Sequence, residues 1–231
     1  MCISGGNIID FKRSANGWGA NEGLRNVRQF AAQQHLFFEG DARTHVFVIE
    51  SGWVKVYRTL IDGQRQVVGF CNGGSVLGFE GSDEHANACQ AVTDVKVRAI
   101  PFSRIGDICA RDPDLGGQLL RQMGRQLGTA QAQLTAVGLQ SADQKLATFL
   151  VAFADYGADE RGEFDLPMRR TDMAEFLGLR LETVSRKLSD FQQRKWVKMV
   201  SLYRCQILNR AALEALAEGG GEDDRVGARL N

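Results

Sequence analysis

Between residues 34 and 101, hydrophobic positions fall into short runs that are separated by glycine-containing turns. The turns include Asp62-Gly63 and Gly73-Gly74, which favour a reversal of chain direction. Many short strands with glycine between them predict a β-sandwich or β-roll. The runs are rich in β-branched and aromatic side chains and occupy residues 46–49, 53–57, 66–70 and 95–100.

After these runs the hydrophobic pattern takes a helical period. Pro113 suits the first turn of a helix, and the apolar positions that follow are three and four residues apart up to about Gln140. So narrow a seam favours contact between this helix and its copy in a second chain. The alternative is that the seam packs against the chain's own β-roll. The seam consists of Leu120, Met123, Leu127, Ala130, Leu134 and Val137.

Residues 171–189 predict two short helices that meet at a tight turn. Thr171 is the expected N-cap of the first helix, and Gly178 can adopt the positive φ that ends it. In the second helix, Val184 and Leu188 face inward. Small Ala174 in the first helix, with Gly178 at the turn, fits a helix-turn-helix.

The opposite face of the second helix is polar and carries Glu182, Ser185, Arg186 and Ser189. Arginine can bind guanine bidentately, glutamate can accept from the amino group of cytosine, and serine can bond either kind of base. Residues 168–210 contain ten Lys or Arg and four Asp or Glu, a net charge of +6 in a chain whose total is zero. Such a field is expected of a phosphate-binding face. An ordinary solvated helix pair is the alternative.

Other patterns complete the chain. Ser141 and Asp143 begin a helix over residues 144–156, and residues 196–200 and 205–208 predict a wing hairpin before a closing helix at 211–217. The predicted fold is α+β: an N-terminal β-roll, a long dimerisation helix and a C-terminal winged helix-turn-helix. The expected boundaries are an N-terminal arm (1–25), a β-roll domain (26–110), a dimerisation helix (111–140), a DNA-binding domain (141–218) and a disordered tail (219–231).

Composition excludes several classes of function. No run of about 18 apolar residues is long enough to span a membrane, and the first residues lack a signal-peptide pattern, so we expect a cytoplasmic protein. The five cysteines are scattered, which predicts neither a disulfide framework nor a metal site. No nucleophile–base spacing and no glycine-rich phosphate loop indicates an enzyme.

Leu177-Gly178-Leu179, followed by Glu182-Thr183-Val184-Ser185-Arg186, resembles the recognition element of the CRP/FNR superfamily of transcription regulators. The resemblance extends from about Leu36 to Leu216, and the first domain resembles the cyclic-nucleotide-binding-like β-roll of that superfamily. Ser185 stands where the cAMP receptor branch has glycine, which favours the FNR and FixK branches.

The resemblance implies a homodimeric activator that contacts RNA polymerase and binds a TTGAT-N4-ATCAA palindrome. FixK-like regulators of this type control microaerobic, anaerobic or nitrogen-fixation genes. The DNA-binding residues that it implies, together with the polar stripe, are Arg169, Arg170, Thr171, Arg180, Glu182, Thr183, Ser185, Arg186, Lys187 and Ser189.

The sensory domain departs from the pattern of its ligand-binding relatives. Residues 80–88 correspond to the segment that grips the cyclic phosphate, but they contain three acids and no Arg-Ser, so we expect an arginine-free pocket that repels cAMP. Arg98 stands where FNR proteins have an internal iron–sulfur cysteine, so no cofactor is expected. A cyclic-nucleotide-gated regulator of the same fold is the alternative.

Cys205 lies in the predicted wing beside Arg204 and near Arg210, which raises the hypothesis of redox control. Cationic neighbours lower the pKa of a thiol, and the thiolate is the form that oxidises. The alternation of the strand favours a different interpretation, a cysteine packed inward with Ile207.

Overall fold

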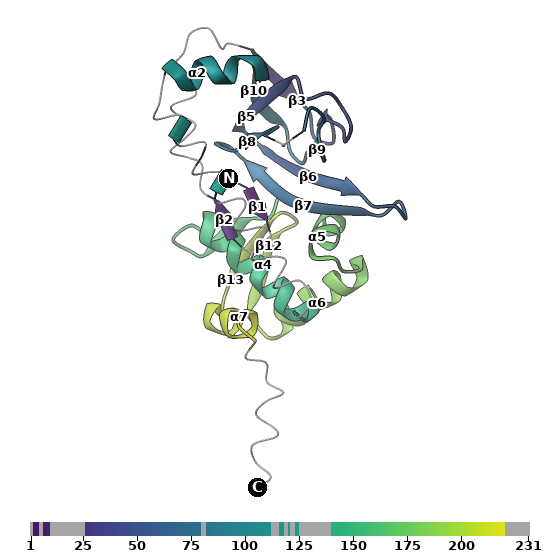
Figure 1. Cartoon of the computed structure of the whole chain (residues 1–231). Coiled ribbons are helices and arrows are strands. Elements are labelled where there is room, and N and C mark those ends of the chain that lie inside the picture. Colours follow the sequence, from purple (N-terminus) through teal and green to yellow (C-terminus); the bar gives the residue numbers. More distant parts are fainter. Residues whose placement is uncertain are drawn as a thin grey trace. The chain divides into compact units, whose positions relative to one another are not determined.

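A computed structural model of the chain divides it into two units, Met1–Ala132 and Gln133–Asn231 (Figure 1). The structure describes residues 2–4, 7–9, 26–79, 82–111, 116–117, 120, 123–124 and 140–219.

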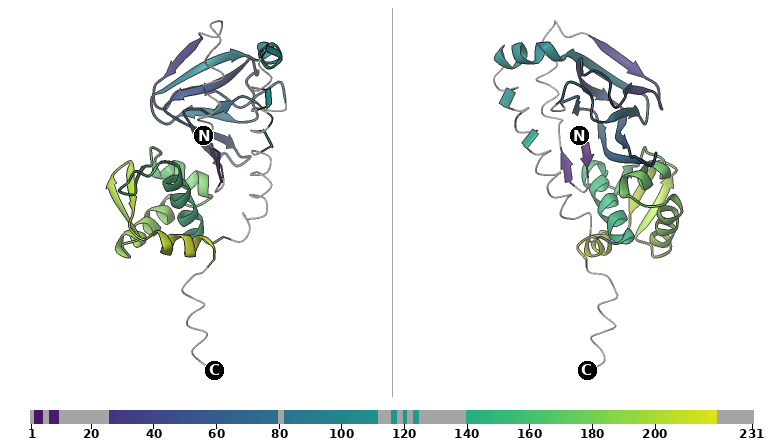
Figure 2. Two further views of the ribbon diagram at one scale, coloured as in Figure 1. Left: turned by 90° about the vertical axis from the view of Figure 1, so that its left-hand side faces the viewer. Right: turned by 45° about the vertical axis from the view of Figure 1, so that its right-hand side comes forward.

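Two antiparallel sheets form the first unit (Figure 2). The six-stranded sheet has the order β2-β1-β7-β6-β9-β4, and the four-stranded sheet has the order β3-β10-β5-β8. In chain order the strands are β1 (Cys2–Ser4), β2 (Asn7–Ile9), β3 (Val27–Phe30), β4 (His35–Phe37), β5 (His45–Ser51), β6 (Trp53–Thr59), β7 (Arg65–Asn72), β8 (Val76–Leu77), β9 (Ala88–Ala91) and β10 (Val95–Pro101).

The main core of this unit combines side chains from both sheets. Val54 and Cys89 come from the six-stranded sheet, whereas Ile49 and Val97 come from the four-stranded sheet, and all four are fully buried. A second cluster lies on the other face of the four-stranded sheet, where helix α2 (Ile105–Arg111) follows the short 3-10 helix η1 (Phe102–Arg104). The β-roll predicted from the hydrophobic runs is therefore confirmed.

Gly52 shows why glycine separates two of the predicted strands. Its φ is +87°, and a Cβ atom at this position would lie 2.2 Å from the carbonyl oxygen of Asp94. Both the positive φ and the close backbone approach require glycine. This turn lets β5 and β6 enter different sheets.

The structure adds elements that the sequence patterns did not predict. Strands β3, β4, β8 and β9 are at most four residues long, and α2 has seven residues, so each holds too few positions to establish a period. Part of the expected arm is also ordered into strands, because β1 pairs with both β2 and β7.

The predicted dimerisation helix falls mostly outside the described residues. Leu120 and Met123 are described, and their side chains are 71% and 44% exposed. The remaining seam residues, and the tail beyond Gly219, lie outside the described ranges.

The second unit combines helices with a three-stranded sheet of order β11-β13-β12. Its core gathers Leu150 and Phe153 with Phe164, Phe191 and Leu213, each at most 1% exposed. The helix, wing and closing-helix predictions are confirmed. In chain order the elements are α4 (Ala142–Gly157), β11 (Glu163–Asp165), α5 (Arg170–Leu177), α6 (Leu181–Gln193), β12 (Val197–Ser201), β13 (Arg204–Ile207) and α7 (Arg210–Ala217).

Candidate nucleic-acid interface

Helices α5 and α6 are separated by a turn with well-defined ends. The backbone N–H of Arg169 donates to Asp172 Oδ2 at 3.0 Å, so the first turn of α5 is closed by a carboxylate. Thr171 is therefore not the N-cap: it lies inside the helix, which begins at Arg170. Gly178 has the expected left-handed conformation, with φ at +63°, and the N–H of Leu179 donates to the carbonyl of Ala174 at 3.0 Å.

The two faces of α6 divide as the sequence predicts. Val184, Leu188 and Phe191 are at most 2% exposed and pack into the domain. Glu182, Ser185 and Arg186 are exposed on the other face, where their spacing of three and four residues places them together. The helix thus presents a carboxylate, a hydroxyl and a guanidinium side by side.

Several predicted DNA-binding side chains are available to a ligand. Arg169, Thr171 and Arg180 are exposed, like the three on α6. Within the described part of the chain, the side chains of Arg180, Glu182 and Arg186 form no ion pair or hydrogen bond. Charges that have no internal partner remain free to bind bases or phosphates.

Other residues of the predicted set have partners inside the domain. Lys187 Nζ donates to Asp143 Oδ2 at 2.7 Å, and both side chains are about 30% exposed. The hydroxyl of Ser189 donates to the carbonyl of Ser185 at 3.0 Å. Arg170 and Thr183 are half-buried, and burial lowers the pKa of Arg170. The helical period could not show these contacts, since Asp143 lies 44 residues before Lys187.

Two exposed lysines extend the basic surface beyond the predicted set. Lys195 follows α6 with φ at +56°, and Lys198 lies on β12. Only the local excess of positive charge identified them in the sequence. Arg194, by contrast, pairs with Asp190 at 3.3 Å and stacks over Trp196.

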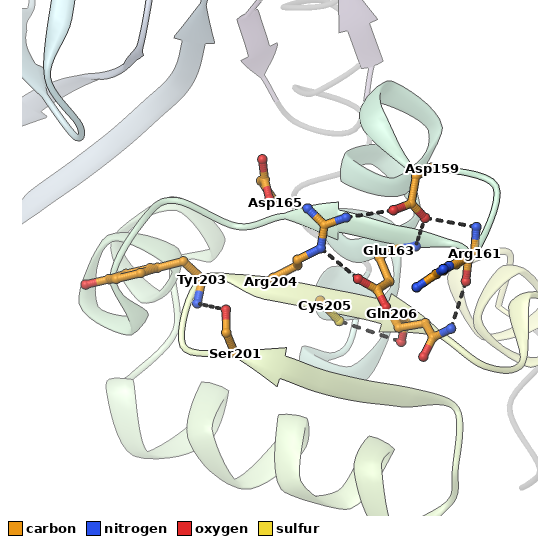
Figure 3. A network of polar contacts seen from close by, with 9 residues as sticks. All are labelled: Asp159, Arg161, Glu163, Asp165, Ser201, Tyr203, Arg204, Cys205 and Gln206. Carbon is orange, nitrogen blue, oxygen red and sulfur yellow. Dashed lines mark hydrogen bonds and ion pairs between the residues drawn. The ribbon is translucent and has the colours of Figure 1, made fainter.

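In the wing, Arg204 is held by three carboxylates (Figure 3). Its guanidinium lies 2.7 Å from Asp159, 2.8 Å from Glu163 and 3.2 Å from Asp165. Asp159 also accepts the backbone N–H groups of Arg161 and Glu163, at 2.9 and 3.0 Å. Bonds from Glu163, then Arg161 and Arg204, hold the pKa of Asp159 below its usual value. This network joins β13 to the loop before β11.

The environment of Cys205 does not support the hypothesis of redox control at this residue. Its side chain is fully buried, and burial raises the pKa of the thiol to about 12. Arg204 is engaged with its carboxylates, and Arg210 pairs with Asp155 and Glu214, so neither cation activates the thiol. The inward packing favoured by the strand alternation is confirmed.

In the first unit, side chains of the chain itself pack around the segment that precedes β9. His85 is 3% exposed and its ring stacks on Phe37 with 3.8 Å between centroids. The expectation that this site contains no arginine is wrong, because Arg43 lies beside it. The Nε of Arg43 donates to the carbonyl of Ser82 at 2.6 Å. However, the Arg43 side chain is 8% exposed and lies 3.6 Å over the Phe102 ring. It therefore holds the segment rather than projecting into solvent.

Arg98, which lies on β10, is part of an ion-pair group. It donates to Glu50 at 2.6 Å, and Lys96 lies 3.3 Å from the same carboxylate. Burial alone would raise the pKa of Glu50, but the hydrogen bonds from Arg98 and Lys96 outweigh it and lower the pKa. The described residues contain no group of three or more potential metal ligands. They also include no helix long and apolar enough to cross a membrane.

Each of the two units matches the model of a known protein family. Residues 27–112 match the family model of the cyclic nucleotide-binding domain, and residues 144–216 match that of the Crp-like helix-turn-helix domain. The first match coincides with the β-roll, and the second coincides with the winged helix-turn-helix.

Two transcription regulators are similar to most of the chain. The fumarate and nitrate reduction regulatory protein of Escherichia coli K12 is 34% identical over 190 residues, which is 80% of this chain and 75% of that protein. The transcriptional activator protein Anr of Pseudomonas protegens is 31% identical over 207 residues, which is 87% of this chain and 84% of that protein.

Solved structures have the same fold. FixK2 from Bradyrhizobium japonicum is 28% identical with a TM-score of 0.76, covering 82% of this chain and 96% of that structure. A CooA mutant from Carboxydothermus hydrogenoformans, 18% identical with a TM-score of 0.76 over 91% of this chain and 97% of that one, shares the fold. The chain belongs to the CRP/FNR family of DNA-binding transcription regulators, a family of regulators and not of enzymes.

Proposed function

We propose that this chain is a cytoplasmic, FixK-like transcription activator that binds a TTGAT-N4-ATCAA palindrome as a homodimer and contacts RNA polymerase. The observation that carries the proposal is the set of exposed side chains on α6. Glu182, Ser185 and Arg186 occupy neighbouring positions, and the two charged groups have no internal partner within the described residues. Together they match the donors and acceptor that a G·C pair requires.

The surrounding charge supports binding to the DNA backbone. Arg169, Arg180 and Lys198 are exposed around the reading helices. Cations of this kind neutralise phosphates and fix the register of a protein on the duplex without reading sequence. The surface therefore offers separate groups for positioning and for base recognition.

A dimer is supported by the apolar seam that the sequence predicts in the helix at residues 111–140, together with the symmetry of the expected site. Two copies of α6 related by a twofold axis would read two inverted half-sites. The 71% exposure of Leu120 in the single chain leaves an apolar side chain that a second copy could cover.

A cyclic-nucleotide-gated regulator is the second candidate. It is favoured by the match of residues 27–112 to the cyclic nucleotide-binding domain. Against it, residues 82–88 contain no arginine, and the nearby Arg43 is buried against Phe102 and bonded to Ser82. A cyclic phosphate requires an accessible cation or a nest of amides.

Selection of bound duplexes from a random pool, with and without cAMP, tests both candidates. We expect enrichment of an inverted repeat related to TTGAT-N4-ATCAA, equally in both conditions. An unrelated motif would overturn the assigned recognition, whereas enrichment only with cAMP would favour the nucleotide-gated alternative.

A further inference from the structure

Helix α6 ends in a Schellman motif, in which the backbone of the following residues closes the last turn. The N–H of Lys195 donates to the carbonyl of Gln192 at 3.0 Å, and the N–H of Trp196 donates to the carbonyl of Phe191 at 2.9 Å. The rings of Phe191 and Trp196 lie 5.3 Å apart, which adds the apolar contact that often accompanies this motif. Two hydrogen bonds and a ring contact therefore fix the backbone conformation at residue 195.

The residue at this position is a lysine, although the conformation favours glycine. Lys195 has φ at +56°, in the left-handed region, where a side chain is sterically costly. Helix α5 ends with the same conformation and uses Gly178, whose φ is +63°. Of the ten described residues with positive φ, eight are glycine, and Gln33 in the first unit is the other exception. The backbone of this turn therefore disfavours the side chain that stands there.

The side chain of Lys195 is exposed and forms no hydrogen bond or ion pair within the described residues. Its neighbour Arg194, in contrast, pairs with Asp190 and stacks over Trp196. A cation near a helix C-terminus gains from the helix dipole, but Arg194 already supplies one. Strained backbone conformations gather at functional sites, so a strained residue with an unpaired charge is a candidate for binding.

The position of Lys195 at the end of α6 indicates what its ammonium group can bind. Gln193 is exposed and lies seven residues after Arg186, so the polar stripe continues to the last residue of the helix. Thirteen residues form a helix of about 20 Å, whereas the major groove is about 12 Å wide. A helix that reads bases in the groove therefore brings its end close to a phosphate strand.

We propose that Lys195 binds a DNA phosphate at the C-terminal end of α6, and that the strained turn is retained because it presents this ammonium group. The inference rests on DNA binding through α6, which is part of the proposed function. Lysine binds phosphate as a point charge, and a phosphate contact carries no sequence information. Lys195 thus fixes the position of α6 in the groove, while Glu182 and Arg186 read the bases.

Four substitutions separate the backbone conformation from the charge. Lys195→Gly and Lys195→Asn suit a positive φ but remove the ammonium group, Lys195→Gln removes it without suiting a positive φ, and Lys195→Arg keeps a cation. In urea unfolding, the midpoint of Lys195→Gly should rise, because glycine relieves the strain. An unchanged or lower midpoint would show that the turn is not strained by lysine and would overturn that part of the proposal.

DNA titrations of the full-length variants measure the role of the charge. Each phosphate contact that is lost lowers the salt slope by about 0.9, so the fall in affinity between about 50 and 200 mM salt should become about threefold smaller per contact. Lys195→Gly, Lys195→Asn and Lys195→Gln should all show this change and bind more weakly. The loss should be equal for the selected palindrome and for an unrelated duplex, and Lys195→Arg should bind like the unmodified protein.

Arg161→Gln is the control for the general charge of the domain, because Arg161 is an exposed cation outside the predicted DNA-binding set. At about 150 mM salt, screening should leave its DNA affinity nearly unchanged. Equal effects of Lys195→Gln and Arg161→Gln, or unchanged DNA binding by Lys195→Gly, would overturn the phosphate contact. A less stable Lys195→Gln with unchanged DNA binding would assign the lysine to the helix dipole instead. If the unmodified protein binds no duplex, the proposed function itself fails, whereas the unfolding experiment still reports on the strain.

Discussion

At the scale of single residues, the exposed groups of α6 differ in how far the fold already uses them. Arg186 and Glu182 are exposed and have no internal partner in the described structure, whereas Lys187 is bonded to Asp143. A guanidinium that has no internal partner can exchange its hydrogen bonds to water for hydrogen bonds to a base, and no contact within the protein is lost. A paired ammonium must first give up its carboxylate, so adjacent cations on one helix serve different purposes.

Replacement of Arg186 by Ala should weaken binding to the selected palindrome by about 1–3 kcal/mol and relax the choice at one G·C pair of each half-site. The matched control is Lys198→Ala, which should weaken all sequences about equally and reduce the salt dependence. Binding titrations on the palindrome and on single-base variants distinguish the two. A uniform loss for Arg186→Ala would make it a phosphate contact.

Replacement of Lys187 by Met should lower the stability of the DNA-binding domain by about 1 kcal/mol and leave base preference unchanged. The reason is that Asp143, whose Oδ1 is buried without a hydrogen bond, would lose its cation. Urea unfolding of Lys187→Met, Asp143→Asn and the double variant measures the coupling. Additive effects in this cycle would show that the pair contributes nothing.

At the scale of elements, the wing is braced by charge rather than by a large core. Its tip exposes Leu202 and Tyr203, while Cys205 packs inward and Arg204 points to the carboxylates on the other side of β13 (Figure 3). The alternation of a strand explains both directions at once. Order at the tip therefore depends on contacts with the loop at residues 159–163.

This brace should be sensitive to acid. Since the folded-state pKa of Asp159 is depressed, its contribution to stability is present above the unfolded-state pKa and is lost as the pH falls through the folded-state value. Asp159→Asn retains an oxygen for the backbone N–H groups but removes the charge. We expect this variant to lose less stability than the unmodified protein between pH 7 and pH 3 in urea unfolding.

Glu160→Gln is the matched control for this experiment, because Glu160 is exposed next to the brace. It should follow the pH dependence of the unmodified protein. If Asp159→Asn and Glu160→Gln have the same profile, the ionised Asp159 carboxylate does not stabilise the wing.

At the scale of the whole molecule, we propose that dimerisation through the predicted seam is required for tight binding to the palindrome. Replacement of Leu127 by Glu would place one carboxylate from each chain in the seam, and the dimer dissociation constant should rise about tenfold or more. DNA affinity should fall in parallel. Ala132→Glu adds the same charge on the opposite side of the predicted helix and should alter neither. Light scattering that still shows a dimer for Leu127→Glu would place the seam within one chain.

The sequence by itself determined the parts whose signals are local. The helix-turn-helix could be predicted because Val184 and Leu188 repeat at the helical period and Gly178 supplies the positive φ of the turn. The longer strands could be predicted because β-branched residues and turns alternate over a few positions. In each case neighbouring residues carry enough information, since backbone preference and burial act on the same short segment.

Only the tertiary structure decided which charged and polar groups are free. Lys187 meets Asp143, Arg43 meets Ser82 and Arg204 meets Asp159 across 44, 39 and 45 residues. Strand β1 likewise pairs with β7, from which it is separated by most of the first unit's sequence. No local period encodes such pairs, because they arise when packing of the core brings distant segments together and burial then requires each polar group to find a partner.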